Sequence, residues 1–318
     1  MTAESPAATP ATASTAIEVA NASRWYGNVV AVNDVSFRLD GGITGLLGPN
    51  GAGKSTILHM LAGFLAPSSG AVTVDGRATM GHPELYRLIG LVPEREAVYP
   101  FLTGRQFVEA NARLQGMSAT GARDAAERAI GQVEMAYAAD RAVGTYSKGM
   151  RQRIKVAAAL VHDPAVLLLD EPFNGMDPRQ RLHMMDLLRQ LAASGRVILF
   201  SSHILEEVER VAERVLVIVA GRLAASGDFR EIRRLMTDRP HTFTIRSSDD
   251  RALAAALMVQ PMISSVALDD GTITVRTADF GAFSRSVASV ARDAGISLHE
   301  LLPTDESLES VFSYLVRR

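Results

Sequence analysis

The stretch GPNGAGKST, residues Gly48, Pro49, Asn50, Gly51, Ala52, Gly53, Lys54, Ser55 and Thr56, decides the fold of this 318-residue chain. It follows a short apolar segment, GITGLL (42–47), and leads into TILHMLAGFL (56–65), which has helical spacing. A strand, a glycine loop and a helix in this order form the βα unit of a nucleotide-binding sheet. The loop amides form a concave site for phosphate groups, the lysine reaches the terminal phosphates and the serine ligates Mg²⁺. The pattern predicts a phosphate-binding loop.

Two adjacent carboxylates end the buried strand AVLLLDEP (165–172). Ligands of such a sheet bind beside the carboxyl ends of its strands. Neighbouring residues on a strand point to opposite sides, so Asp170 and Glu171 are expected to have different roles. We assign Asp170 to the Mg²⁺ and Glu171 to the attacking water, which it would orient and deprotonate. An ordinary polar strand end is the alternative.

Two further polar residues follow buried segments. His203 comes directly after VILFSS (197–202) and alone would be typical of a core or capping residue. Beside the other motifs, it indicates a donor to the γ-phosphate and the attacking water. Asp177, in NGMDP (174–178), precedes Pro178 and is typical of a helix N-cap. Capping is compatible with a place at the nucleotide.

Composition limits the classes of function. Hydrophobic residues make up 47% of the chain and charged residues 21%, the balance of a globular protein. The formal net charge of −2 argues against a nucleic-acid partner. No cysteine is present, which excludes disulfides, thiolate catalysis and cysteine metal sites. The apolar runs fall far short of the roughly 20 residues that span a bilayer.

The pattern along the chain predicts two domains. Residues 17–228 alternate strands with helices and contain a helical subdomain at about 94–162, with helix starts after Thr103 and Ser118. Residues 229–318 read strand, helix, strand, strand, helix, strand, the ferredoxin-like order, and close with a helix in SLESVFSYLVRR (307–318). Residues 1–16 are rich in Ala, Thr, Pro and Ser and predict a disordered tail without a secretory signal.

Five motifs occur in the order of one known family: GPNGAGKST (48–56), YSKGM (146–150), LLLDEP (167–172), NGMD (174–177) and SSH (201–203). They resemble the Walker A loop, signature, Walker B strand, D-loop and switch histidine of the ATP-binding cassette (ABC) ATPases. The resemblance implies an α/β P-loop NTPase of ABC type, with a mostly parallel sheet, antiparallel strands and a helical subdomain, followed by a small C-terminal α+β ferredoxin-like domain. It also implies ATP as the nucleotide and Mg²⁺ as the metal.

The family pairs two cassettes head to tail, with each nucleotide between the Walker A loop of one and the signature of the other. By this resemblance Ser147 and the amide of Gly149 face the γ-phosphate held by a second ATP-binding subunit, a copy or a close homologue. Helix N-termini are ready anion sites, and a second one in the chain needs a second phosphate group. If YSKGM were only a surface turn, no dimer would be required.

Three positions match the family less directly. Tyr26, in RWYGN (24–28), corresponds to the aromatic residue that stacks on adenine, although Trp25 is a rival and an ordinary half-buried aromatic residue is another alternative. Glu94 stands where the family has a glutamine that touches the metal. A carboxylate is still a hard ligand for Mg²⁺, but it adds negative charge beside the triphosphate. Lys148 replaces the usual signature glycine; its ammonium either adds to the helix-end field or points to solvent.

The resemblance implies an ATP-hydrolysing subunit that powers a separate membrane-spanning permease. The C-terminal residues, including SLESVF (307–312), resemble the accessory domain of cassettes from bacterial drug, antibiotic, polysaccharide or lipid exporters. The expected location is cytoplasmic, peripheral on the inner face of the cell membrane. One alternative is a cassette acting on ribosomes or DNA, but one phosphate loop and no sustained heptads argue against it. A catalytically silent regulatory subunit is the other, against which Glu171 and His203 argue.

Overall fold

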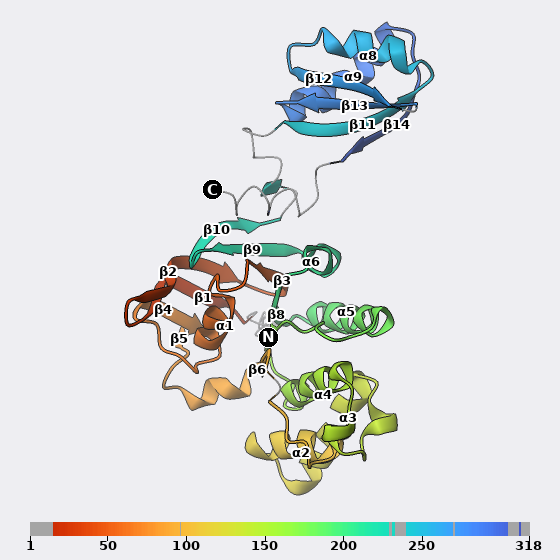
Figure 1. Cartoon of the computed structure of the whole chain (residues 1–318). Helices are drawn as coiled ribbons and strands as arrows, with labels where there is room; N and C mark the ends of the chain where they lie inside the picture. The colour runs from red at the N-terminus through yellow and green to blue at the C-terminus, as the bar shows by residue number, and fades with distance from the viewer. Residues whose placement is uncertain are drawn as a thin grey trace, which may run out of the picture. The chain divides into compact units, whose positions relative to one another are not determined.

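A computed structural model describes residues 15–95, 97–228, 231–232, 240–269, 271–304 and 312. Most of the predicted tail (1–16) and of the predicted closing helix (307–318) lies outside these residues. The chain divides into two compact units, Met1–Ala224 and Ala225–Arg318 (Figure 1). Among the helices that are described, none combines the length and apolarity that a membrane crossing requires.

The first unit begins with an antiparallel sheet in the order β2-β1-β4-β5. Its strands are β1 (Ile17–Tyr26), β2 (Val29–Leu39), β4 (Ser69–Val74) and β5 (Arg77–Ala78). Val35, Phe37 and Leu39 of β2 are buried, whereas the residues between them are exposed. This alternation is what the sequence predicts for a sheet with one face on the core.

A second sheet of six strands has the order β10-β9-β3-β8-β7-β6. Its strands are β3 (Gly42–Leu47), β6 (Ile89–Val92), β7 (Val166–Asp170), β8 (Val197–Ser202), β9 (Arg214–Val219) and β10 (Arg222–Gly227). β3 pairs in parallel with β8 and β9, and β7 pairs in parallel with β6 and β8. The carboxyl ends of β3, β7 and β8 therefore meet at one edge, which brings their following loops together.

Helices cover both faces of this sheet. α1 (Lys54–Leu61) packs between the two sheets, with β2 and β4 on one side and β7 on the other. α5 (Pro178–Ala193) and α6 (Leu205–Val211) pack on β3 and β8. α1 is shorter than the helical spacing of residues 56–65 predicts: it ends at Leu61, and Gly63 has a φ of +72°, which breaks the helix.

Three helices form the predicted helical subdomain: α2 (Gly104–Leu114), α3 (Ala119–Gln132) and α4 (Lys148–Leu160). Figure 1 shows them gathered at one end of the first unit. The predicted starts of α2 and α3 are confirmed: the side chains of Thr103 and Ser118 accept hydrogen bonds from the first-turn amides. Short 3₁₀ segments lie at η1 (Pro83–Arg87), η2 (Ala136–Ala138) and η3 (Val143–Thr145).

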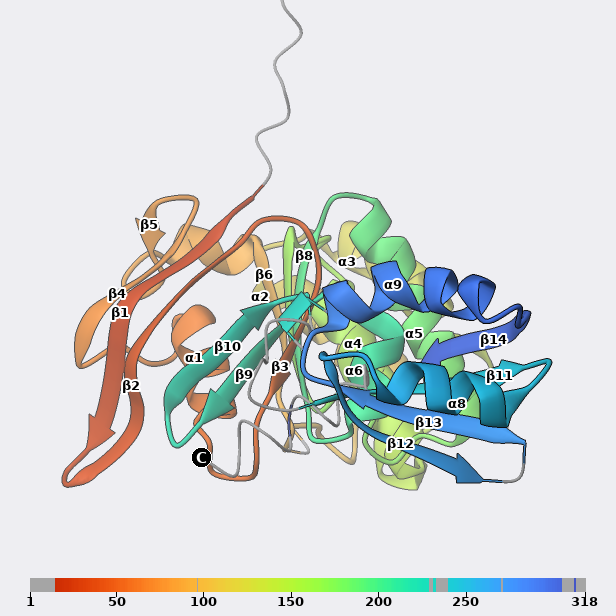
Figure 2. The ribbon, with the colours of Figure 1, turned by 90° about the horizontal axis from the view of Figure 1, so that it is seen from above.

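The second unit has the predicted βαββαβ order. Its elements are β11 (His241–Ser247), α8 (Asp250–Met258), β12 (Ile263–Asp269), β13 (Thr272–Thr277), α9 (Phe280–Asp293) and β14 (Leu298–Pro303). The strands form an antiparallel sheet in the order β12-β13-β11-β14. α8 and α9 run side by side over it (Figure 2) and bury Leu253, Leu257 and Phe283 against Phe243 and Ile245.

Candidate functional site: a nucleotide cleft at the carboxyl edge of the sheet

The glycine loop connects β3 to α1 and needs its glycines for two reasons. Gly51 and Gly53 have φ angles of +79° and +105°, which side chains rarely tolerate. A Cβ on Gly53 would also lie 2.4 Å from the carbonyl oxygen of Ala31, and one on Gly48 would lie 2.4 Å from that of Ile218. Nothing lies within 4 Å of a Cβ on Gly51, so the loop is open on that side. The backbone can therefore meet a phosphate group directly.

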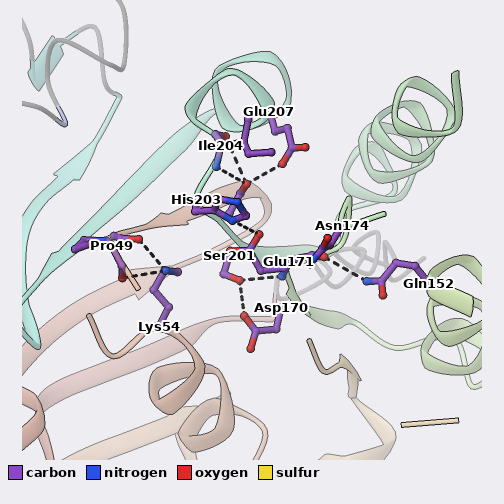
Figure 3. A network of polar contacts seen from close by, with 12 residues as sticks. Pro49, Lys54, Gln152, Asp170, Glu171, Asn174, Ser201, His203, Ile204 and Glu207 are labelled. Atoms are coloured by element: carbon purple, nitrogen blue, oxygen red, sulfur yellow. Dashed lines mark hydrogen bonds and ion pairs between the residues drawn. The ribbon is translucent and has the colours of Figure 1, made fainter. Parts of the chain in front are cut away.

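Lys54 begins α1 and is buried although it is charged. Its Nζ donates to the carbonyl oxygens of Gly48 at 2.7 Å and Pro49 at 3.2 Å (Figure 3). Burial lowers the pKa of Lys54 from its ordinary value, against the opposing effect of Glu171, Asp170 and Glu94. A buried ammonium facing three carboxylates and a phosphate-binding loop is suited to hold an anionic ligand.

The different roles of Asp170 and Glu171 remain a prediction, and the reason given for them, alternation along a strand, does not apply. β7 ends at Asp170, and Glu171 has a left-handed backbone with φ of +52°, so strand alternation does not separate the two side chains. Ser201 of β8 donates from Oγ to Asp170 Oδ1 at 2.5 Å and accepts from the Glu171 N–H at 3.0 Å. The fully buried Ser201 thus links the Asp170 carboxylate to the Glu171 backbone, a role that the sequence did not reveal.

His203 lies directly after β8 and reaches Glu171. Its Nδ1 is 2.8 Å from Glu171 Oε2, and Figure 3 shows the two side chains pointing toward each other. The carboxylate is 10% exposed and the imidazole 53%, so the ring lies at the mouth of the site. The predicted base and the predicted donor are in direct contact.

The loop, the carboxylates and the histidine surround one cleft of about 370 Å³. Its lining residues are Ala31, Asn50, Gly51, Gly53, Lys54, Ser55, Thr56, Glu94, Asp170, Glu171 and His203. Ala31 is the lining residue that the sequence did not predict; it lies on β2, and only the packing of that strand brings it here. Gly48, Pro49 and Ala52 belong to the loop without lining the cleft.

Glu94 reaches the cleft from the loop after β6. Lys155 of α4 holds this loop: its Nζ donates to the carbonyl oxygens of Pro93 at 2.7 Å, Glu94 at 3.4 Å and Arg95 at 3.1 Å. Lys155 is buried, and the sequence did not single it out. The backbone of this loop is thus fixed, and Glu94 lines the cleft together with residues of the phosphate loop.

The aromatic residues near the end of β1 are exposed. Tyr26 is 47% and Trp25 is 44% exposed, and neither lines the cleft. The guanidinium of Arg24 lies 4.7 Å from the centre of the Tyr26 ring, a cation–π contact. The choice between the two rings for the adenine remains a prediction.

The signature residues lie outside this cleft. Ser147 caps α4 and accepts from the Met150 N–H at 3.2 Å. Lys148 is exposed at the start of α4, and its Nζ donates to Asn174 Oδ1 at 2.9 Å; the choice between its two predicted arrangements remains a prediction. Gly149 is buried, and a Cβ there would lie 2.9 Å from the carbonyl oxygen of Gly175. The start of α4 is therefore packed against the segment that follows Glu171.

Asp177 caps α5, as the sequence predicts. Its Oδ1 accepts from the Gln180 N–H at 2.8 Å, and Pro178 occupies the first helical position. The side chain does not line the nucleotide cleft. A contact with nucleotide remains a prediction.

The donor set of the cleft fits Mg²⁺. Ser55, Asp170 and Glu94 offer hydroxyl and carboxylate oxygens, the hard ligands that this ion prefers. Within the described part of the chain, no three His, Cys, Asp or Glu side chains form a metal-binding group by themselves. Mg²⁺ usually keeps several waters and is held by one or two carboxylates with substrate phosphates, so an all-protein cage is not required.

The fold and the cleft define a P-loop nucleotide-binding protein, and comparisons identify the family. Residues 32–174 match the family model described as ABC transporter. The chain is 32% identical to the daunorubicin resistance ATP-binding protein DrrA3 of Streptomyces coeruleorubidus, over 95% of this chain and 96% of that protein. It is 39% identical to the Nod factor export ATP-binding protein I of Rhizobium leguminosarum bv. viciae, over 67% and 69% of the two chains. The chain belongs to the ABC transporter ATP-binding proteins.

Solved structures agree with this assignment. An ATP-binding subunit of an ABC transporter is 30% identical, with a TM-score of 0.63 over 69% of this chain and 92% of that one. A dimeric bacterial ABC transporter cassette, 24% identical, has a TM-score of 0.63 over 67% and 98% of the two chains, which supports the fold. The predicted cassette fold is thus confirmed, and the protein is a nucleotide-binding ATPase of the ABC class.

Proposed function

We propose that this chain hydrolyses MgATP as one of a pair of cassettes and thereby drives export through a separate membrane-spanning subunit. The observation that carries the proposal is the division of the site. Lys54, Asp170, Glu171 and His203 line one cleft, whereas Ser147 and its helix lie outside it. Relatives whose names state drug resistance and Nod factor export support the direction of transport.

In this proposal residues 48–56 hold the phosphates by backbone amides and by the Lys54 ammonium. Ser55, Asp170 and Glu94 hold Mg²⁺, which when bound neutralises charge on the phosphate oxygens. Lys54 already lies against the loop carbonyls, so it needs to move only from Gly48 and Pro49 to a phosphate. Tyr26 stacks on the adenine, a contact that selects weakly among bases.

Glu171 is proposed as the general base. It orients a water for attack on the γ-phosphorus and accepts its proton, while the bond from that phosphorus to the bridging oxygen breaks to release ADP and phosphate. General-base catalysis of this kind typically contributes about 10²- to 10⁴-fold to the rate. His203, hydrogen-bonded to Glu171 through Nδ1, presents its other ring nitrogen to the transferred phosphoryl group.

The second cassette, a copy of this chain or a close homologue, supplies what the cleft lacks. The N-terminus of α4, with the Ser147 hydroxyl and the Gly149 amide, carries the positive end of a 13-residue helix. We place it on the γ-phosphate of the partner cassette, with Lys148 and Asp177 at the same seam. Lys148 contributes there by holding Asn174 beside the signature.

The membrane subunit is proposed to dock at a second cleft of about 600 Å³. Phe64, Tyr86 and Leu114 line it and are 66%, 36% and 85% exposed. Pro93 lines it too, while the adjacent Glu94 lines the nucleotide cleft, so one short loop touches both. A partner docked here would hold the protein at the cytoplasmic face of the membrane and would sense the nucleotide through residues 93–95.

Purification of the tagged full-length chain from detergent-solubilised membranes of its native cell tests the assembly. We expect a stoichiometric membrane-spanning polypeptide, identified by mass spectrometry, and loss of its recovery when Leu114 in the second cleft is changed to Glu. Leu182→Glu, at an exposed site outside that cleft, is the matched control. Recovery with ribosomes and without any membrane protein would contradict the proposal.

A further inference from the structure

Glu207 is a buried carboxylate that the proposed chemistry does not use. It lies in α6, is 5% exposed, and comes four residues after His203. Ser202 Oγ donates to Glu207 Oε2 at 2.8 Å and accepts from the Ile204 N–H at 3.0 Å. Figure 3 shows Ile204 and Glu207 beside His203. Two hydrogen bonds at Ser202 Oγ thus link Glu207 to the turn 202–204, which has His203 at its centre.

The other oxygen of Glu207 faces a second element. Oε1 lies 3.5 Å from Arg181 Nη1 of α5 and has no hydrogen-bond partner in the described structure. α5 is the helix that Asp177 caps, and Arg181 lies one turn beyond that cap. Burial raises the pKa of Glu207, while Ser202 and Arg181 oppose the rise. Burying a carboxylate costs free energy unless it is paired. We therefore expect the buried Glu207 to have a structural role, in which it fixes the residues that it contacts.

From this geometry we propose that Glu207 is a positioning residue for hydrolysis, which holds the 202–204 turn so that His203 stays against Glu171. The inference rests on the proposed function, because it acts through His203. His203 is half exposed, and among the described residues its side chain hydrogen-bonds to Glu171, which leaves its backbone to be held by other contacts. A displacement of about 1 Å at such a group can lower a rate about 10²-fold.

A double-mutant cycle tests the proposal on the full-length protein. Glu207→Ala is expected to lower kcat for ATP about 10- to 100-fold with KM within about twofold, since the phosphate loop is untouched. Glu207→Gln keeps an oxygen acceptor for Ser202 and is expected to restore most of kcat. In a His203→Ala background Glu207→Ala should have no further effect, because the group it positions is gone.

Controls separate this role from folding and from the wider proposal. Glu206→Gln, on the exposed neighbour, should leave kcat unchanged. If Glu207→Ala does not fold, Ser202→Ala replaces that variant in the cycle, because it removes the hydroxyl that links Glu207 to the turn. Additive losses from Glu207→Ala and His203→Ala, or full kcat in Glu207→Ala, would overturn the inference. Full kcat in His203→Ala would instead overturn the role proposed for His203.

Discussion

His203 Nδ1 lies 2.8 Å from Glu171 Oε2 although 32 residues separate them along the chain. The contact follows from topology, since β7 and β8 pair in parallel and Asp170 is in register with Ser201. The loops after the two strands therefore leave the sheet side by side. Glu171, the proposed base, and His203, the proposed hydrogen-bond donor to the γ-phosphate, are thus positioned by the pairing of two strands. Ser201 lies next to them and hydrogen-bonds to Asp170 and to the Glu171 N–H.

Glu171→Gln is expected to lower kcat about 10²- to 10⁴-fold, because an amide cannot accept the proton of the attacking water. ATP binding should persist, since Lys54 and the loop are unchanged. Phosphate release at saturating MgATP and binding of a fluorescent ATP analogue measure the two quantities. Unchanged turnover would mean that Glu171 is not the base.

Ser201→Ala is expected to destabilise the first unit by about 1–3 kcal/mol, because it leaves the buried Glu171 N–H without its acceptor. Asp170 Oδ1 loses its hydroxyl donor in the same variant. Urea denaturation followed by tryptophan fluorescence of Trp25 would measure the change. A free energy of unfolding within a few tenths of the original would show that water replaces the hydroxyl.

Glu94→Gln tests the departure from the family glutamine. If Glu94 ligates Mg²⁺, the variant needs several-fold more Mg²⁺ for half-maximal ATPase activity, because a neutral amide oxygen is a weaker ligand. Activity as a function of Mg²⁺ concentration at saturating ATP measures this. An unchanged Mg²⁺ requirement with a lower KM for ATP would mean that Glu94 only repels the triphosphate.

His162 makes stability depend on pH. It follows α4, its Nε2 lies 3.2 Å from the Ile89 carbonyl oxygen, and burial lowers its pKa below the ordinary 6.5. The unfolded chain therefore takes up a proton first as the pH falls below 6.5, and stability is lost. Urea denaturation above and below this pH should show a steeper loss in the original protein than in His162→Gln. Parallel pH profiles would rule out the effect.

Local signals were sufficient to predict several features. Thr103 and Ser118 mark the starts of α2 and α3, because an N-cap acts within one turn. The phosphate loop was predictable because its backbone conformation and close contacts exclude side chains at the glycine positions, which fixes a recognisable local sequence. The alternation of β11 and β13 and the apolar stripes of α8 and α9 likewise predicted the order of the second unit.

Some features were not predictable, for two reasons. The strands β4 and β10 give a weak signal in the sequence, because SGAVTV and RLAASG carry glycine and small residues. Other features depend on residues that are distant along the chain. The left-handed backbone of Glu171 was missed because it depends on the turn after β7 and on Ser201, 30 residues away. The contact of Lys148 with Asn174 was missed for the same reason, since the direction of a long side chain is set by the residues that fold against it.

The central claim, that two cassettes share each nucleotide, is tested most directly by sedimentation of Glu171→Gln protein with and without MgATP. We expect a monomer without nucleotide and a dimer with it. Adding Ser147→Arg should abolish the dimer, because a bulky cation would displace the start of α4 from the seam. A monomer at every protein concentration with ATP bound, or a dimer that survives Ser147→Arg, would contradict the account.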